Sequence, residues 1–383
     1  MLALAEPSGA ARRAVRGAAV LVFCALCASG PLLRWLGPHA KTLASVELPA
    51  LEPARLLDGS LLAAVERNLR ESSPLVYHVR GIHCETLQRI GWLDSAAIAF
   101  GRDGWWFLRS ERTFPAEAFT AAGAARRATY AALHERVRRL GVGMLALLVP
   151  DKSRIYRDRL ASGTDYPQSR EPLHATLASE LRGAGIPVVD LLSLYEGLRR
   201  AEPETVLWYA RDSHWNGAGM AHAAKAVKEE LERLGWLERL GPARGIQPLQ
   251  ASYPDIGSDM MSVLGIRPDS AVGRRLTEPR DQFAYTIPGS VGTAPRAQPS
   301  APWALAGTSY SHEGLISLLP IFVGRPIDAT SVHNGWLPVR VLREAIARIE
   351  RREIAPAVLV WEVPERLEIE EPWDEIAREL GGI

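Results

Sequence analysis

The sequence predicts an α/β fold, with a parallel sheet covered by helices on both faces. Short continuous apolar runs alternate with longer segments of helical periodicity through most of the chain. Continuous apolar strands are typical of sheets that are buried on both sides. The composition is that of a globular protein, because 47% of the 383 residues are hydrophobic and 23% are charged. No repeat of fixed period is visible.

The charge balance and the cysteines narrow the class of protein. Forty-five Lys and Arg side chains nearly cancel 44 Asp and Glu side chains, so no overall field favours a nucleic-acid partner. A local basic groove for a charged polysaccharide stays compatible with this balance. Cys24 and Cys27 lie in an N-terminal apolar run, which leaves Cys84 alone in the rest of the chain, so that part has no intramolecular disulfide framework. The 11 tryptophans favour core packing over sugar platforms.

Residues 1–40 predict a signal anchor or a cleaved signal peptide. Arg12, Arg13 and Arg16 precede an apolar segment at 17–33. Such arginines stay in the cytoplasm, so the rest of the chain is expected to cross the membrane. The anchor is favoured because no clear cleavage site precedes a polar stretch, and the alternative is a buried helix of a soluble protein. Residues 41–383 then form one domain.

The first elements of that domain are a helix and a hairpin. Leucines and Val65 recur at helical spacing over 55–71, before Ser72-Ser73-Pro74. Residues 96–100 and 105–108 predict two strands around a tight turn. Gly101 and Gly104 bracket that turn and are expected to supply its positive φ angles.

Helices and strands then alternate. The pattern predicts helices at 119–140, 173–183, 218–234 and 339–351, and strands at 144–149, 186–191, 303–306 and 357–363. Residues 236–300 have many Gly, Pro and Arg residues and little periodicity, which predicts a variable loop or lid insert, or else a small subdomain. Lys152 and Arg154 follow Pro150, where a solvated loop is favoured over contact with an acidic sugar.

Two short motifs carry the chemistry. Asp212-Ser213-His214-Trp215 places an acid two residues before a histidine, and Gly307-Thr308-Ser309-Tyr310-Ser311 follows an apolar strand. An acid in that position can hold the imidazole in one tautomer, and a serine at the carboxyl end of a strand is placed to be a nucleophile.

We therefore assign Ser309 as the candidate nucleophile, His214 as its general base and Asp212 as the acid that orients His214. Thr308 and Ser311 are the local competitors, and a serine that bonds its own turn is the structural alternative. Helix capping is the alternative for Asp212 and the favoured role for Asn216, while Trp215 is expected to pack and hold the histidine ring.

These residues resemble a known family. WYARDSHWNGAG (208–219) and WALAGTSYS (303–311) are similar to SGNH-hydrolase-like proteins of the alginate O-acetyltransferase (AlgJ/AlgX) type, with support from GRDGWWFL, LALLVPDKSRIY, GSDMMSVLG and VLVWEVPER. The resemblance runs from about residue 55 to the C-terminus. In ordinary SGNH hydrolases the serine block comes first and the histidine block last. The reversed, circularly permuted order here, and an acid–histidine spacing one residue shorter, are typical of the acetyltransferases. The resemblance sets Ser309 in place of the serine of the Gly-Asp-Ser block.

An oxyanion hole requires N–H donors beside Ser309. The Ser309 N–H is the first candidate, and Tyr310 or the Asn334-Gly335 turn supplies the second. No metal site is expected, because no HxH, HExxH or cysteine cluster accompanies His312 or His333. No glycine-rich phosphate loop is present either, so no cofactor is expected.

The resemblance implies a periplasmic enzyme, held at the inner membrane or released, that moves an acetyl group through Ser309 onto exopolysaccharide hydroxyls. Its acetyl donor partner would be a multi-spanning membrane acyltransferase, because coenzyme A esters are absent outside the cytoplasm. The alternatives are an SGNH-type carbohydrate acetylesterase and a non-catalytic polysaccharide-binding assembly subunit. The sequence leaves the polymer open.

Overall fold

The computed structural model describes residues 81–87, 95–161, 165–250, 257–289 and 293–380. It divides into two compact units, one of residues 1–93 and 264–272 and one of residues 94–263 and 273–383. In the first unit, residues 81–87 are helical, and Glu85 forms an ion pair with Arg267 at 3.7 Å. The predicted anchor at 1–40 and the predicted helix at 55–71 lie outside the described residues. No helix within the described ranges is long and apolar enough to span a membrane.

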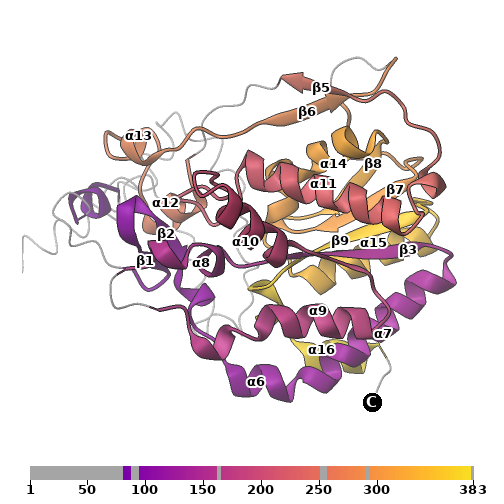
Figure 1. Ribbon diagram of the computed structural model, residues 1–383, viewed down its shortest axis with the longest axis horizontal. Helices are drawn as coiled ribbons and strands as arrows, with labels where there is room; N and C mark the ends of the chain where they lie inside the picture. The colour runs from indigo at the N-terminus through magenta and orange to yellow at the C-terminus, as the bar shows by residue number, and fades with distance from the viewer. Residues whose placement is uncertain (1–80, 88–94, 162–164, 251–256, 290–292, 381–383) are drawn as a thin grey trace, which may run out of the picture. The chain divides into compact units, whose positions relative to one another are not determined.

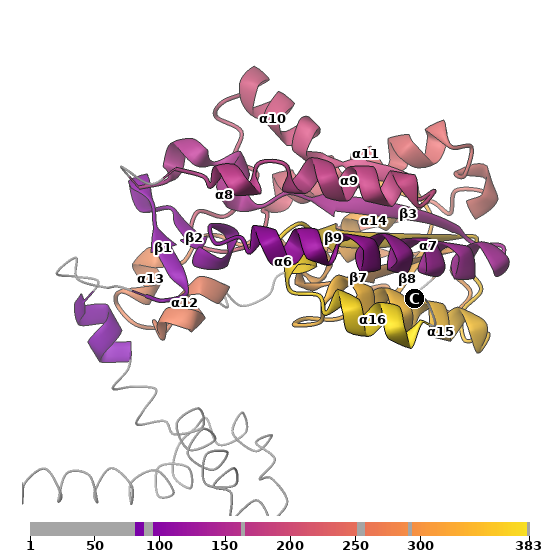
Figure 2. The same cartoon turned by 90° about the horizontal axis from the view of Figure 1, so that it is seen from below.

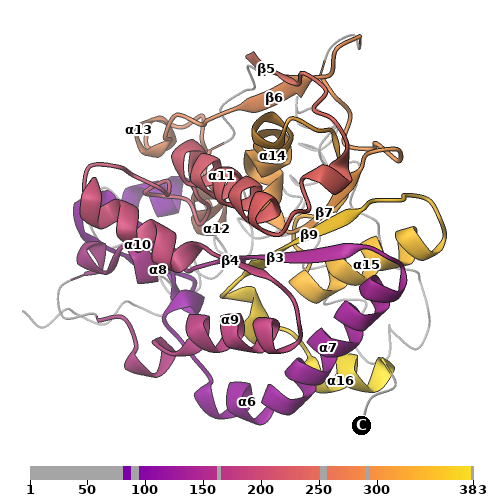
Figure 3. The ribbon, with the colours of Figure 1, turned by 45° about the vertical axis from the view of Figure 1, so that its right-hand side comes forward.

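The second unit is built on a five-stranded parallel sheet with the strand order β4-β3-β9-β7-β8 (Figures 1 and 3). The α/β class and the parallel sheet predicted from sequence are therefore confirmed. The strands are β3 (Gly143–Val149), β4 (Val188–Asp190), β7 (Trp303–Gly307), β8 (Ile327–Val332) and β9 (Val358–Pro364).

Alternate residues of the central strands pack into two separate apolar cores. Leu145 and Leu147 of β3 face one core, and Ala146 and Leu148 face the other. All seven residues of β3 are buried, as are all seven of β9. Burial of both faces explains why these strands appear in the sequence as uninterrupted apolar runs.

Helices cover both faces of the sheet (Figure 3). One face packs against α10 (Leu191–Ala201), α11 (Gly217–Arg233) and α14 (Ile316–Val323). The other packs against α7 (Gly123–Arg139), α9 (Leu173–Gly183), α15 (Pro338–Glu350) and α16 (Trp373–Glu379). Helix α7 lies between α9 and α16 (Figure 2).

The predicted hairpin is present, but one of its turn residues differs from the expectation. β1 (Ile98–Phe100) pairs antiparallel with β2 (Trp106–Leu108). Gly104 has the expected positive φ of 77°, whereas Gly101 has a φ of −98° and Asp103 takes the second left-handed position with a φ of 53°. Gly101 is required for a different reason: a Cβ there would lie 2.3 Å from the carbonyl oxygen of Arg159.

Residues 236–300 contain several short elements. β5 (Gln247–Gln250) and β6 (Phe283–Thr286) form an antiparallel ribbon, and β6 packs beside α14. Two short helices, α12 (Asp259–Leu264) and α13 (Gly273–Leu276), lie between these strands in the sequence.

Some elements differ from the sequence prediction. The predicted helix at 119–140 is two helices, α6 (Ala116–Ala121) and α7, joined at Ala122. Strand β8 and helices α10 and α14 were not predicted. β8 was missed because Asp328 and Ser331, both buried, interrupt its apolar pattern.

Candidate active site

The Asp212–His214 motif lies in a tight loop between α10 and α11. Trp208 and Trp215 form an isolated antiparallel bridge, and the N–H of Asn216 donates to the carbonyl of Leu207 at 3.0 Å. The side chain of Asn216 then accepts the N–H of Gly219 at 3.1 Å and caps α11, as expected from the sequence. The loop is thus fixed at both ends before it presents His214.

Ser309 begins the helical turn that follows β7. Gly307 allows this turn to fold tightly, because a Cβ at Gly307 would lie 2.3 Å from the hydroxyl of Ser311. Buried Glu362 on the neighbouring strand β9 holds this turn by hydrogen bonds. One of its carboxylate oxygens accepts the Thr308 N–H at 2.7 Å, the Ser311 N–H at 3.2 Å and the Ser311 hydroxyl at 2.8 Å.

The structure brings the three candidate residues together. The Nε2 atom of His214 lies 2.9 Å from the hydroxyl oxygen of Ser309, and its Nδ1 atom lies 2.7 Å from a carboxylate oxygen of Asp212. An ionised carboxylate can only accept a hydrogen bond, so Nδ1 carries the proton and Nε2 is free to accept the Ser309 proton. Ser309 is half-buried, while His214 and Asp212 are buried.

The charges around this pair shift the pKa values of both residues. Burial alone would raise the pKa of Asp212, but the hydrogen bond and charge of His214, together with the charge of Arg280, hold that pKa well below its usual range. Burial alone would lower the pKa of His214, but Asp212 and then Asp259 outweigh it and leave that pKa raised. Asp212 is therefore ionised whenever His214 acts as a base.

Tyr310 packs against the site. Its ring meets the ring of His214 edge-on with centroids 5.0 Å apart, and the ring of Trp215 at 5.5 Å. The Trp215 indole N–H donates to the Tyr310 carbonyl at 3.0 Å. Trp215 is thus a packing residue, as expected, but it supports His214 through Tyr310. The Tyr310 hydroxyl donates to the Ser213 carbonyl and accepts from Arg366, both at 3.0 Å.

Lys152 and Arg154 are buried, which corrects the expectation of a solvated loop. The Lys152 ammonium donates to the backbone carbonyls of Trp106, Ala210 and Asp212 at 2.6–2.9 Å. Burial lowers the pKa of Lys152 to about 8. Arg154 forms an ion pair with buried Glu365. Lys152 therefore ties the β1–β2 hairpin to the Asp212 loop.

Two charged residues that the sequence did not single out also contact the motif. Asp259 accepts the Ser213 N–H at 3.0 Å, and its other carboxylate oxygen lies 3.7 Å from Nδ1 of His214. Arg280 forms an ion pair with Asp212. They are 47 and 68 residues from Asp212 in the chain, so no local pattern connects them with it.

Asp212, His214 and Asp259 offer ligand atoms that lie within 4.8 Å of one another, a spacing that a metal ion could use. Their carboxylate oxygens already accept hydrogen bonds from protein groups, and the guanidinium of Arg280 places a positive charge there. A metal ligand must direct a lone pair at the ion, and a nearby guanidinium repels that ion. This donor set therefore fits a proton relay better than a cation.

Residues 98–365 match the model of a family described as an SGNH hydrolase-like domain of the acetyltransferase AlgX. The match covers well over half of the chain. The chain belongs to this acetyltransferase family. Its fold is thus SGNH-like, as the sequence motifs indicated. No curated protein sequence matches the chain closely enough to count as a relative.

Two solved structures have the same fold as this AlgX-family chain. The O-acetyltransferase domain of Pseudomonas putida AlgJ is 19% identical, with a TM-score of 0.59, and the alignment covers 74% of this chain and 99% of that domain. Pseudomonas aeruginosa AlgX is 20% identical, with a TM-score of 0.51, and the alignment covers 73% of this chain and 65% of AlgX.

The two candidates for the second oxyanion-hole donor in this AlgX-family domain, Tyr310 and Asn334, follow the carboxyl ends of β7 and β8. Asn334 is exposed in the turn after β8, and the neighbouring His333 N–H donates to the Gly307 carbonyl at 3.0 Å, which ties this turn to the end of β7. The Tyr310 N–H lies 3.4 Å from the Thr308 hydroxyl, a weak bond. His333 contacts Glu344 and stacks on Trp336.

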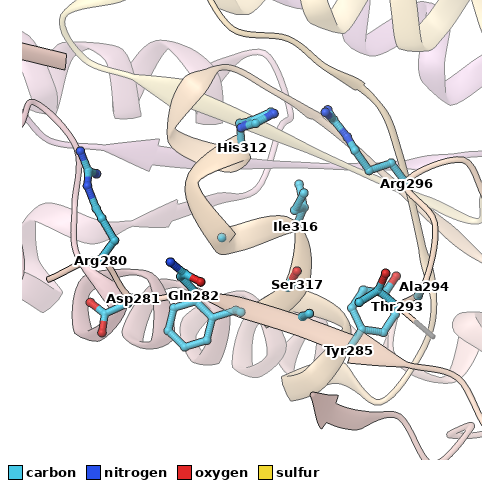
Figure 4. Close-up of a pocket in the computed structure, with 13 residues that line it drawn as sticks. Arg280, Asp281, Gln282, Tyr285, Thr293, Ala294, Arg296, His312, Ile316 and Ser317 are labelled. Carbon is cyan, nitrogen blue, oxygen red and sulfur yellow. The ribbon is translucent and has the colours of Figure 1, made fainter. Parts of the chain in front are cut away.

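A cavity of about 520 Å³ is lined in part by Arg280 and His312, and its volume is within the usual range for small-molecule sites. Figure 4 shows Arg280 and Arg296 on opposite sides of it, with Ile316 between them. Arg280 also contacts Asp212, and His312 is three residues beyond Ser309. The cavity is therefore one side chain away from the candidate catalytic residues.

Proposed function

We propose that this chain is an O-acetyltransferase that carries an acetyl group on Ser309 and passes it to a hydroxyl of an exopolysaccharide. The observation that carries the proposal is the continuous chain of contacts from Asp212 through His214 to Ser309, inside an acetyltransferase-family domain. Alginate is the first candidate polymer, because the chain belongs to the AlgX family and its motifs resemble the alginate O-acetyltransferases of the AlgJ/AlgX type.

In the first half-reaction the Ser309 oxygen attacks the acetyl carbonyl carbon of the donor ester, and His214 Nε2 takes the serine proton. The tetrahedral intermediate collapses, the donor's ester bond breaks, and His214 returns the proton to the departing oxygen. In the second half-reaction a sugar hydroxyl gives its proton to His214 and attacks the acetyl-serine. Ser309 leaves with that proton, so the enzyme returns to its starting state.

The negative oxygen of each tetrahedral intermediate requires N–H donors. The Ser309 N–H is the first donor in this proposal, because the N–H groups of a first helical turn lack intrahelical acceptors. The weakly bonded Tyr310 N–H and the exposed Asn334 amide are the two candidates for the second donor. Asn334→Ala separates them: a fall in kcat of about 10²-fold assigns Asn334, and an unchanged kcat assigns Tyr310.

If the chain is exported, the acetyl group must be delivered to Ser309 outside the cytoplasm. Arg12, Arg13 and Arg16 before the apolar segment 17–33 support export and an inner-membrane anchor or signal peptide. A multi-spanning membrane acyltransferase then supplies the acetyl group as a partner. Alkaline phosphatase fused after residue 383 should be active in cells. Activity of a cytoplasm-only reporter at the same position would contradict the periplasmic location.

The experiment that tests the function compares transfer to sugar with transfer to water. The protein is incubated with a chromogenic acetyl ester and a panel of exopolysaccharide oligosaccharides. The masses of the oligosaccharides are then measured by mass spectrometry. We expect acetylated oligosaccharides, and we expect neither these nor acetate with His214→Ala. A bound acceptor hydroxyl has an effective concentration that water does not reach. Full acetate release without any acetylated sugar would identify an esterase, and no release at all would favour a binding subunit.

A further inference from the structure

The segment between β5 and β6 brings two opposite charges to the Asp212–His214 pair. The Asp259 N–H donates to the outer carboxylate oxygen of Asp212 at 2.9 Å, and Arg280 binds the same oxygen. The inner oxygen is left to accept the backbone N–H of His214 at 2.9 Å and its Nδ1–H at 2.7 Å. Four donors thus fix the plane of one buried carboxylate.

Both residues are themselves held in place. The carboxylate of Asp259 accepts the Ser213 N–H and the Ser213 hydroxyl, and the Asp259 side chain is 39% exposed. The guanidinium of Arg280 also donates to the Gly257 carbonyl at 2.9 Å and lies over the ring of Tyr209, 4.6 Å from its centroid. The side chain of Arg280 is 11% exposed.

We propose that Asp259 and Arg280 form a charged clamp that positions Asp212 against His214 and sets the pH at which His214 becomes a base. They are positioning residues, because each acts on the reacting atoms through Asp212 or His214. This inference rests on the proposed function, since it assumes that His214 is the base.

The two charges act on His214 in opposite directions. The Asp259 carboxylate faces Nδ1 at 3.7 Å and stabilises the protonated ring, although solvent screens part of this effect. The Arg280 cation neutralises part of the Asp212 charge and so disfavours the protonated ring. Other charged or titratable groups that act on His214 or lie against its loop are Asp212, Arg366, Lys152 and Tyr310, and Tyr209 lies against Arg280.

The sign of each variant's effect follows from this arrangement. Activity rises as His214 loses its proton, so the acidic limb of the pH profile follows the pKa of His214. Asp259→Asn removes a negative charge, and the limb should move to lower pH by about 0.5 unit, a small shift because the carboxylate is partly exposed. Arg280→Gln removes a positive charge, and the limb should move to higher pH by about 1 unit.

The test is the pH profile of kcat/KM for acetate release from a chromogenic acetyl ester, measured on the full chain. Glu230→Gln and Arg233→Gln are matched controls with the same charge changes near the far end of α11. Residue 230 is 13 residues along α11 from Gly217, or about 20 Å at 1.5 Å per residue. The acidic limbs of the two control variants should therefore not move. Arg280→Lys keeps the cation and should keep the wild-type limb.

The proposal predicts opposite shifts for Asp259→Asn and Arg280→Gln. Lower kcat values with an unmoved limb, or shifts in the same direction, would overturn it and leave the two residues a purely structural role. If Arg280→Gln fails to fold, Asp259→Asn still tests the proposal, because an unmoved limb there would contradict it. Acetate release does not involve the sugar acceptor. Opposite shifts without any sugar acetylation would therefore support the clamp while the transferase function fails.

Discussion

Replacing Glu362 by alanine should loosen the turn that carries Ser309. The carboxylate accepts four hydrogen bonds: the Thr308 N–H and hydroxyl, and the Ser311 N–H and hydroxyl, at 2.7–3.2 Å. All four donors are buried, and each lost bond lowers the free energy of unfolding by about 1 kcal/mol, or about 4 kcal/mol in total. For a domain of this size that corresponds to a fall of about 10 °C in Tm.

Glu362→Gln is the matched control. Its amide oxygen can take the place of the oxygen that accepts three of these bonds, and its NH₂ group can face the Thr308 hydroxyl. We expect a loss of about 1 kcal/mol and a fall of about 3 °C in Tm. Differential scanning calorimetry measures both, and the acetyl-ester assay should give kcat reduced by about 10–100-fold in the alanine variant alone, because Ser309 is displaced.

The pH dependence of stability in the wild type and in Glu362→Gln gives a second readout. Burial raises the pKa of Glu362 above its ordinary value, even though Thr308 and Ser311 donate to it. An acid with a raised folded-state pKa contributes most to stability below its unfolded pKa, and that contribution is lost as the pH rises through the folded pKa. The stability gap between the wild type and Glu362→Gln should therefore narrow as the pH rises. An alanine variant with wild-type Tm and kcat would show that Glu362 does not hold the Ser309 turn.

Substitutions at four further positions test other parts of the site. Ser309→Ala should abolish acetate release with almost no change in Tm. Ser311→Ala should keep activity but lower the free energy of unfolding by about 1 kcal/mol, because the Ser311 hydroxyl donates to Glu362. Calorimetry and the ester assay distinguish the two variants. The reverse pattern would move the nucleophile to Ser311. Asp212→Asn should lower kcat by at least about 10³-fold, because the protonated His214 loses its counter-charge, and normal steady-state turnover would remove Asp212 from the mechanism. Asn216→Ala should cost about 1 kcal/mol in urea unfolding through the lost cap of α11. Asn216→Ser also lacks the amide that donates to the Val206 carbonyl but keeps a capping oxygen, so it should cost less; equal losses would argue against capping.

The sequence predicts the elements whose signal is local. β3 and β9 are continuous apolar runs, and α11 follows directly on its Asn216 cap, so each is visible within a short window. β8 was not recognised, because its buried Asp328 is stabilised by Arg348, a residue of α15 that only the fold brings near.

The same distinction holds for the candidate site. Ser309, His214 and Asp212 carry motif signals, and the structure brings them together. Lys152 was expected in solvent because lysines are rarely buried, but three backbone carbonyls surround its ammonium. Asp259 stands in a motif that supported the family resemblance, yet its contact with the Asp212–His214 loop arises only when residues 47 positions apart meet.

The proposed reaction requires an acetyl group on Ser309. To detect this group, the protein is mixed with an acetyl-ester donor without acceptor and quenched in acid within the first turnovers, and the digest is mapped by tandem mass spectrometry. We expect the added mass of one acetyl group on Ser309, absent from Ser309→Ala and strongly reduced in His214→Ala. An acetyl group on Ser311, Thr308 or another residue, or turnover without any acetylated peptide, would contradict the proposed reaction.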